Sequence, residues 1–246
     1  MSEPQRLDQL LVTLSLFASR SRARDAIQRG TVTVDGKVVT KPGTLFTEEA
    51  QIGIDDPAQD YVSRAALKLV AALDYFHLDP QGLHCLDVGA STGGFTEVLL
   101  QRGAAHVTSI DVGHGQMHPR ISADPRVTSM EGLNARNLTI DDIGKPFSFL
   151  VSDVSFISLK LALAPALVLA EQGAHAALLV KPQFEAGRDA IGKAGLLKDP
   201  SSAPAVAAEL ERWFSEDMGW KSLGLIASPI AGGDGNHEFL LAGIKP

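Results

Sequence analysis

The 246-residue sequence has almost no cysteine and no apolar run long enough to span a membrane. Its single cysteine, Cys85, excludes an intramolecular disulfide, a Cys-x-x-Cys metal knuckle and any chemistry that needs two thiols. The longest charge-free apolar run, residues 161–170, is far shorter than the roughly 20 residues that cross a bilayer. The first residues also lack the basic start and apolar stretch of a secretory signal. We therefore expect a cytoplasmic protein with no membrane role.

The chain as a whole also lacks positive charge, because its formal net charge is −7. The charge is unevenly distributed. Residues 1–46 contain seven Lys/Arg and four Asp/Glu, a net charge of +3, whereas the remaining 200 residues have a net charge of −10. Any contacts with phosphate groups are therefore expected at the N-terminus, although charge splits of this size also occur in proteins that bind no nucleic acid. The length leaves room for one ordinary α/β domain and one small additional domain.

The N-terminal segment predicts two helices followed by a hairpin. Leucines spaced by three and four positions predict a helix over residues 6–17. Ser19 or Ser21 can cap a second helix, which runs through Arg29 and ends at Gly30. Residues 32–39 form two alternating apolar runs around Asp-Gly, the pair best suited to a type I′ turn.

This order of elements, with an arginine-rich second helix that ends in Arg-Gly, resembles the RNA-binding domain named after ribosomal protein S4. The resemblance covers residues 5–46 and implies a small α+β domain that binds RNA. The residues then expected to contact RNA are Arg6, Arg20, Arg22, Arg24, Arg29, Lys37 and Lys41. The alternative is that the arginines form only a solvated helix face.

After an acidic stretch over residues 48–60, the pattern changes to alternating helices and apolar strands. We expect two domains, residues 1–58 and 59–246. The strands are predicted at residues 84–88, 106–111, 147–152, 176–180, 222–226 and 239–244. Alternation of this kind indicates an α/β fold with a mostly parallel sheet and helices on both faces. Ligands of such sheets bind at the carboxyl ends of the strands.

A glycine-rich turn follows the first of these strands. Its glycines allow a sharp turn and close approach to a ligand, and the next helix offers free N–H donors. The turn, residues 89–94, lacks the middle glycine of the dinucleotide-binding fingerprint. The second strand ends at Asp111, whose carboxylate can accept hydrogen bonds from ribose hydroxyls.

Seven motifs resemble the TlyA/hemolysin A group of the FtsJ-like 2′-O-methyltransferases. They lie at residues 61–69, 87–96, 111–113, 131–136, 153–157, 181–185 and 235–239. The resemblance implies a class I Rossmann-like methyltransferase with a seven-stranded sheet, S-adenosylmethionine as cofactor and ribosomal RNA as substrate. The expected cofactor-binding residues are Asp87, Gly89, Ser91, Gly93, Gly94, Phe95, Asp111 and Asn134. No metal is expected, because His114 and His118 lack a third ligand at suitable spacing.

FtsJ-like enzymes use a Lys-Asp-Lys-Glu set, and the corresponding motif positions are Lys68, Asp153, Lys181 and Glu238. A ribose hydroxyl attacks only as it loses its proton, and a lysine whose ammonium is destabilised by a second lysine can accept that proton. We expect Lys181 to be the base, oriented by Asp153 and Glu238. Lys68 then positions the substrate or tunes the charge, although the two lysines could exchange roles. Phe184 could line the substrate pocket, whereas Phe156 is expected to be packed in the interior.

Four alternative functions compete with this one. Methylation of cytosine carbon 5 needs a cysteine after a middle or late strand, but Cys85 lies in the first. Methylation of an exocyclic amine commonly uses Asn/Asp-Pro-Pro-aromatic, and residues 153–156 lack both prolines. A pore-forming role is a further alternative. The sequence predicts neither a membrane-spanning helix nor, outside the N-terminal segment, a basic amphipathic helix. A catalytically inactive ribosome-assembly factor stays open, because a sequence does not reveal turnover.

The resemblance also bears on the substrate. The family has a longer form that modifies cytidines in both ribosomal subunits and a shorter form limited to large-subunit RNA. The first helix here begins near Arg6, and the chain stops two residues after Ile244, which resembles the shorter form. We therefore expect a cytidine 2′-hydroxyl of 23S rRNA in the large ribosomal subunit to be the substrate.

Overall fold

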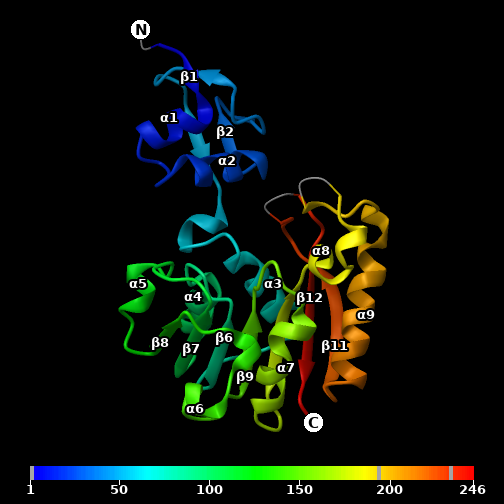
Figure 1. Cartoon of the computed structure of the whole chain (residues 1–246). Helices are drawn as coiled ribbons and strands as arrows, with labels where there is room; N and C mark the ends of the chain where they lie inside the picture. Colours follow the sequence, from blue (N-terminus) through cyan, green and yellow to red (C-terminus); the bar gives the residue numbers. More distant parts are fainter. Residues whose placement is uncertain (1–2, 193–194, 233–234) are drawn as a thin grey trace. The chain divides into compact units, whose positions relative to one another are not determined.

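The computed structural model describes residues 3–192, 195–232 and 235–246. The chain divides into two compact units, Met1–Gln59 and Asp60–Pro246 (Figure 1). The described residues of the N-terminal unit form one hydrophobic core, and those of the second unit form two. Each of these cores lies within a single unit.

The N-terminal unit is a small α+β domain. Its elements are β1 (Gln5–Arg6), α1 (Leu7–Thr13), α2 (Arg20–Gln28), β2 (Val32–Val34), β3 (Lys37–Val38), β4 (Leu45–Phe46) and β5 (Ile52–Ile54). Strand β2 pairs antiparallel with both β3 and β5, and β1 pairs with β4. The core lies between the two helices and β2, and includes Leu7, Leu11, Ile27, Val32 and Val34.

The helices and the hairpin of this unit were predicted from local sequence signals, and only the length of the first helix was wrong. Helix α1 stops at Thr13 rather than at residue 17, because Ser15 adopts a left-handed conformation (φ +57°) that breaks the helix. Ser19, not Ser21, caps α2, since its side chain accepts a hydrogen bond from Arg22 N. The predicted Asp35-Gly36 turn joins β2 to β3, and both residues have positive φ, as a type I′ turn requires.

The second unit contains a seven-stranded, mostly parallel sheet, as predicted. Its strands are β6 (His84–Val88), β7 (His106–Asp111), β8 (Val127–Glu131), β9 (Phe149–Ser152), β10 (His175–Val180), β11 (Lys221–Ala227) and β12 (Phe239–Ile244). The order across the sheet is β11-β12-β10-β9-β6-β7-β8, and β12 runs antiparallel to both of its neighbours. Strand β8 was not among the predicted strands. It is an edge strand with half-exposed residues, and its sequence lacks a strong apolar signal.

Helices cover both faces of this sheet (Figure 1). They are α3 (Ala66–Phe76), α4 (Gly94–Gln101), α5 (Pro119–Ser122), α6 (Ile140–Ile143), α7 (Leu159–Leu169), α8 (Pro182–Glu185) and α9 (Ala203–Glu216), with 3-10 turns η1 (Pro57–Asp60), η2 (Ala135–Asn137), η3 (Arg188–Ala190) and η5 (Pro200–Ser202). Alternate residues of one strand enter opposite cores. Leu178 packs on the side of α7 and α9, and Leu179 packs on the side of α3 and α4. None of the described helices is long and apolar enough to cross a membrane.

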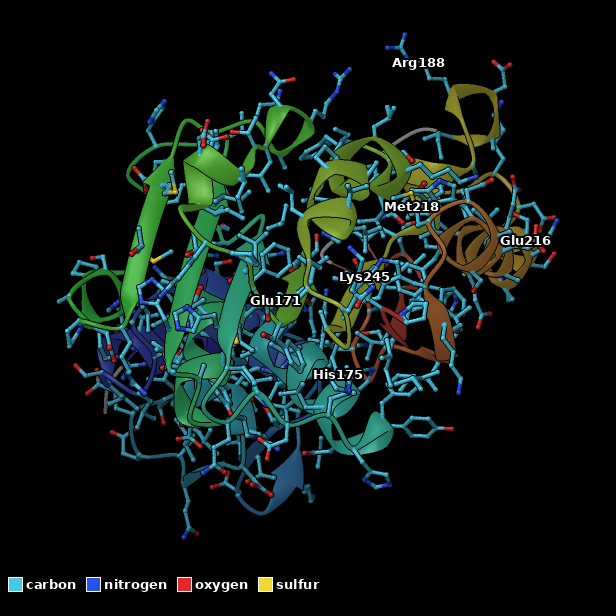
Figure 2. The ribbon with its side chains drawn as sticks, turned by 90° about the horizontal axis from the view of Figure 1, so that it is seen from below. Glu171, His175, Arg188, Glu216, Met218 and Lys245 are labelled. Carbon is cyan, nitrogen blue, oxygen red and sulfur yellow. The ribbon has the colours of Figure 1, made fainter. Side chains whose placement is uncertain are left out.

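The edge of the sheet where the parallel strands begin is closed by local contacts, and Figure 2 views the molecule from this side. Lys245 Nζ donates hydrogen bonds to the carbonyl oxygens of Leu167, Val168 and Ala170, which satisfies the last carbonyls of α7. The ring of His175 stacks on Phe149 with 6.1 Å between the centroids. The strand-end loops that concern function lie at the opposite edge.

Candidate active site

The glycine-rich turn connects β6 to α4 and brings two loops into contact. Gly89 has φ +84°, a conformation that L side chains rarely adopt. A Cβ at this position would lie 2.8 Å from Val154 Cγ1 and 2.9 Å from the carbonyl oxygen of Asp153. Glycine at position 89 therefore allows the loop after β6 to pack directly against the loop after β9.

The other two glycines of the turn also allow close packing. A Cβ on Gly93, which has φ +92°, would lie 3.0 Å from Ile121 Cγ2 of α5. A Cβ on Gly94 would lie 2.8 Å from Ser63 Cβ, just before α3. The turn is thus held between α5 and the segment that leads into α3.

Asp111, at the end of β7, fixes the turn from the other side. Its two carboxylate oxygens accept hydrogen bonds from Ser91 N and Gly113 N, each at 2.8 Å. Asn134 follows β8, where its side chain accepts a hydrogen bond from Arg136 N. The preceding residue, Leu133, donates its N–H to the Asp111 carbonyl oxygen. Ser91, Asp111 and Asn134 therefore gather at the carboxyl ends of β6, β7 and β8.

Two of the predicted cofactor residues lie behind this surface. Asp87 is fully buried, and its Oδ2 accepts a hydrogen bond from Thr96 Oγ1 at 2.7 Å. Burial raises the pKa of the Asp87 carboxyl to about 7, and the negative charges of Asp153 and Asp111 act in the same direction. Phe95 is buried in the core under α4. Both side chains can support a ligand site from beneath without forming its exposed surface.

Lys181 and Asp153 form the first of two buried or nearly buried ion pairs at this edge. Lys181 directly follows β10, and its Nζ lies 2.6 Å from Asp153 Oδ1. The same ammonium donates a hydrogen bond to Ser155 Oγ at 2.7 Å. The ion pair with Asp153 and the hydrogen bond to Ser155 therefore fix the direction of the Lys181 side chain. No sequence signal indicated Ser155 beyond its position in the Asp-Val-Ser motif.

The second ion pair joins Lys68 of α3 to Glu238, which directly precedes β12. Both side chains are buried. Gly232 leaves room for the carboxylate, since a Cβ there would lie 2.7 Å from Glu238 Oε1. Burial of both ions means that neither can be removed without leaving an uncompensated charge.

The strand register brings the two ion pairs to the same edge. Val180 of β10 pairs with Phe239 of β12, so that the next residue on one strand, Lys181, lies beside the preceding residue on the other, Glu238. Strand β9, which ends just before Asp153, runs parallel to β10. The structure thus gathers all four residues of the predicted Lys-Asp-Lys-Glu set beside the glycine-rich turn.

Phe156 is exposed, contrary to the prediction that it packs in the interior. Its side chain is 90% exposed and its backbone has φ +65°. A positive φ is unusual for a bulky residue, and here the ring points into solvent. The Phe184 ring lies 5.3 Å away between centroids and is tilted by 50°. The motif Asp-Val-Ser-Phe-Ile is mostly apolar, so that sequence alone suggested burial.

The seven predicted RNA-binding residues differ in what their side chains do. Arg29 is only 16% exposed and is paired with Asp25 and Asp56, so it holds the N-terminal unit together. Arg22 donates a hydrogen bond to the carbonyl oxygen of Ala58. The other side chains that reach the surface of this unit are Arg6, Arg20, Arg24, Lys37 and Lys41.

The two histidines considered for a metal have local roles. His118 Nδ1 accepts a hydrogen bond from Arg120 N and caps α5. His114 lies against Gly132, where a Cβ would meet its ring. In the part of the chain that the structure describes, no group of three or more His, Cys, Asp or Glu side chains is placed to hold a metal ion.

The fold and the strand-end site define a class of protein. A mostly parallel seven-stranded sheet with one antiparallel strand, a glycine-rich turn after β6 and an acidic residue after β7 are the features of a Rossmann-like methyltransferase. The chain belongs to the FtsJ-like methyltransferase family, whose model matches residues 61–245. Residues 5–52 match the S4 domain model.

Individual relatives are similar along nearly the whole chain. The 16S/23S rRNA (cytidine-2′-O)-methyltransferase TlyA of Mycobacterium tuberculosis is 45% identical, over 98% of this chain and 90% of that protein. The 23S rRNA (cytidine-2′-O)-methyltransferase TlyA of Campylobacter jejuni is 34% identical, over 95% of this chain and 97% of that protein. A solved structure from Streptococcus thermophilus, which carries a hemolysin name, is 38% identical with a TM-score of 0.75, over 100% of this chain and 90% of that one.

Proposed function

We propose that this protein transfers a methyl group from S-adenosylmethionine to the 2′-hydroxyl of a cytidine in 23S rRNA. The observation that carries the proposal is the pair of lysine–carboxylate contacts, Lys181–Asp153 and Lys68–Glu238, beside the glycine-rich turn. The names of the M. tuberculosis and C. jejuni relatives support the reaction type.

The strand-end residues fit a cofactor that carries positive charge. Asp87, Asp111 and Asp153 lie at the ends of neighbouring strands, and burial, together with the charges of the latter two, raises the pKa of the Asp87 carboxyl. Among the residues that the structure describes, Asp87 Oδ1 has no hydrogen-bond partner and is buried. A cationic ligand would relieve this repulsion. Asp111 would hold the ribose hydroxyls, and the turn around Ser91 and Asn134 would line the rest of the site. S-adenosylmethionine supplies an electrophilic methyl group on a sulfonium.

Lys181 is the proposed general base. Lys181 Nζ would accept the 2′-proton as the ribose 2′-oxygen attacks the methyl group that S-adenosylmethionine would supply. Asp153 and Ser155 fix the direction of Nζ. Lys68, held by Glu238, adds positive charge near the attacking oxygen and favours its deprotonation.

Phe156 and Phe184 supply an aromatic surface beside this base. Single-stranded or flipped-out RNA bases stack on exposed aromatic rings. Phe156 is exposed, lies three residues after Asp153 and pairs with Phe184. We assign the two rings to the target nucleoside, whose 2′-hydroxyl must come within hydrogen-bond distance of Lys181.

The N-terminal unit is the proposed RNA anchor. Its side chains Arg6, Arg20, Arg24, Lys37 and Lys41 would contact phosphate groups, whereas Arg22 and Arg29 stabilise the unit. The names of the two relatives have 23S rRNA in common, and only one of them includes 16S rRNA. This shared substrate supports the large ribosomal subunit as the partner. We place the proposed reaction on ribosomal RNA in the cytoplasm.

The proposal is tested with purified protein, labelled S-adenosylmethionine and separated 30S and 50S particles from cells that lack this gene. The expected result is label on a ribose of 23S rRNA and none in 16S rRNA. Comparable label in 30S particles would contradict the restriction to the large subunit, and label on a base would contradict the reaction type. Binding to 50S particles without any label would instead favour an assembly factor.

A further inference from the structure

A single buried carboxylate organises two arginines in the N-terminal unit. Asp8, in the first turn of α1, is fully buried. Arg6 donates to both of its oxygens, with Nε–Oδ1 at 3.0 Å and Nη2–Oδ2 at 3.1 Å. Arg20, at the start of α2, donates through Nε to Oδ2 at 3.1 Å. One carboxylate therefore joins the N-terminal strand to the arginine-rich helix.

The two arginines remain available to a ligand even though both contact Asp8. The side chain of Arg6 is 44% exposed and that of Arg20 is 52% exposed. In the described ranges of the chain, both donate only to Asp8, which leaves Nη1 of Arg6 and the two terminal nitrogens of Arg20 for other acceptors. The group of three ions has a net charge of +1 at the surface of the basic part of the chain.

A second arginine–carboxylate group in the same unit has the opposite character. Arg29 donates two parallel hydrogen bonds of 2.8 Å to Asp56, whose side chain is only 3% exposed. Arg29 itself is largely buried. The Arg29–Asp56 pair has no net charge that would attract an anionic ligand. If Arg6 and Arg20 served only to neutralise Asp8, they too would not need to face solvent.

The surroundings of Asp8 hold the three side chains, Asp8, Arg6 and Arg20, in one arrangement. Burial alone would raise the pKa of the Asp8 carboxyl, but the hydrogen bonds from Arg6 and Arg20 outweigh it and hold the pKa below its usual range. Gly43 gives Arg6 its space, since a Cβ there would lie 2.9 Å from Arg6 Nη1. Gly43 has no positive φ that would require glycine, so the contact with Arg6 is its evident constraint.

We infer that Asp8 is a positioning residue, which holds Arg6 and Arg20 in one arrangement ready to bind RNA backbone phosphates. The inference rests on the proposed function, in which the N-terminal unit anchors ribosomal RNA. A free arginine loses side-chain entropy when it binds phosphate, whereas an arginine already fixed through one edge of its guanidinium loses less. The remaining nitrogens suit phosphate oxygens, which guanidinium groups bind in a fork geometry.

The test compares full-length variants for binding to unmodified 50S particles between 50 and 200 mM KCl at constant Mg²⁺. Asp8→Asn removes the anchoring charge with little change of shape and is expected to weaken binding about 10-fold, because both arginines become mobile. Arg6→Ala/Arg20→Ala removes the phosphate contacts themselves. It is expected to weaken binding further and to lower the salt dependence by about one to two in log–log slope.

Two comparisons separate a binding role from a structural one. Asp56→Asn breaks the buried pair with Arg29 and is the matched control, which should lower thermal stability while 50S affinity stays within about 2-fold of wild type. In the Arg6→Ala/Arg20→Ala background, Asp8→Asn should have no further effect on affinity, because its role passes through the two arginines. An equal loss of affinity in that background would overturn the inference.

The remaining outcomes separate this inference from the proposed function. If the double arginine variant binds poorly but Asp8→Asn binds like wild type, the positioning role of Asp8 is wrong and the RNA anchor stands. If the double arginine variant itself binds like wild type, the inference fails, while the RNA anchor would then rest on Arg24, Lys37 and Lys41. Should Asp8→Asn not fold, Gly43→Ala, which displaces the tip of Arg6, is expected to weaken binding about 3-fold. Unchanged affinity of a folded Gly43→Ala variant would then overturn the inference.

Discussion

At the scale of single residues, the lysines at the strand ends of the second unit differ from an exposed lysine at the opposite edge of the sheet. Lys181 and Lys68 are buried against carboxylates at the strand ends, whereas Lys145 is exposed at the other edge of the sheet, where its Nζ lies 3.2 Å from His84 Nε2. A buried ammonium is costly unless an anion compensates it. The fold therefore maintains two such groups only where they have a partner, and this position coincides with the proposed reaction centre.

Replacement of Lys181 by alanine tests its role as the base. Lys181→Ala is expected to lower the single-turnover rate of methyl transfer by about 10²-fold or more, because no other group takes the 2′-proton. Affinity for S-adenosylmethionine should stay close to wild type. Lys145→Ala, at the opposite edge, is the matched control and should leave the rate unchanged. A Lys181→Ala variant with near wild-type single-turnover kinetics would exclude the assignment.

The pKa of Asp87 predicts a pH dependence of cofactor binding. Since that pKa is about 7, Asp87 is mainly protonated at pH 6 and mainly ionised at pH 8. In the ligand-free protein, this raised pKa contributes stability at low pH that is lost as pH rises from about 4 to about 7. A cationic ligand favours the ionised form and releases the proton, so affinity for S-adenosylmethionine should rise from pH 6 to pH 8. Calorimetric titration at several pH values measures this change.

The control for this pH dependence is a pair of asparagine variants. Asp87→Asn has no proton to release at this site, so its affinity should vary less with pH than that of the wild type. Asp124→Asn should keep the wild-type dependence, because the hydrogen bonds from Arg126 lower the pKa of Asp124 and keep it out of this range. An identical pH dependence in Asp87→Asn and wild type would contradict the role of Asp87.

At the scale of elements, the sheet positions the site through contacts between loops. Gly89 follows β6 and lies against Asp153, which follows β9, although the two residues are far apart in the sequence. Glu185 makes a similar connection, since its carboxylate accepts hydrogen bonds from Ser158 Oγ and Leu159 N at the start of α7. These contacts fix the loop of Asp153 and the segment after Lys181 relative to each other.

Two glycine variants separate loop contact from backbone strain. Gly89→Ala and Gly144→Ala both place a side chain at positive φ, which costs about 1–2 kcal/mol of stability. Only the methyl group at position 89 meets another loop, because Gly144 faces open space. Gly89→Ala is therefore expected to lose methyl transfer and most cofactor affinity, while Gly144→Ala keeps both. Thermal melts and cofactor titration distinguish the cases, and equal behaviour of the two variants would exclude a special role for Gly89.

Much of the element order follows from the sequence, because periodicity and turn residues are local signals. Three strands, β6, β7 and β12, have the predicted bounds. Strand β8 was missed because an edge strand with few buried residues carries a weak pattern. The pairing of residues is less predictable. Lys68 and Glu238 are 170 positions apart, and family motifs rather than spacing linked them. Likewise, the buried pairing of Arg29 depends on Asp56, 27 positions later.

The orientation of Phe156 shows a second limit of prediction from the sequence. An apolar residue in a mostly apolar motif is ordinarily buried, and residues 153–157 contain no glycine or asparagine to indicate a left-handed backbone there. The outward direction of the ring follows from φ +65° in the loop after β9. Local strain of this kind persists only where the surrounding structure imposes it, and it is common at functional sites.

At the scale of the whole molecule, positive charge is concentrated in the first 46 residues, whereas the chemistry is proposed for the second unit. The first 46 residues have a net charge of +3, and the remainder has a net charge of −10. The acidic groups of the second unit include the strand-end carboxylates that suit a cationic cofactor. An acidic catalytic unit is repelled by RNA at long range. The proposed reaction therefore depends on the basic residues 1–46 for affinity and on the second unit for chemistry.

A shortened chain that begins at Asp60 tests this division. It retains both hydrophobic cores of the second unit and all four residues of the Lys-Asp-Lys-Glu set, so it should fold and bind S-adenosylmethionine with wild-type affinity. Its affinity for 50S particles should fall steeply, and the log–log salt slope should decrease by about 0.7 to 0.9 for each phosphate group that the shortened chain no longer binds. Circular dichroism and cofactor titration check the fold, and a salt titration of 50S binding gives the slope. If the shortened chain bound 50S particles with unchanged affinity and slope, the RNA anchor would have to lie in the catalytic unit, despite its negative charge.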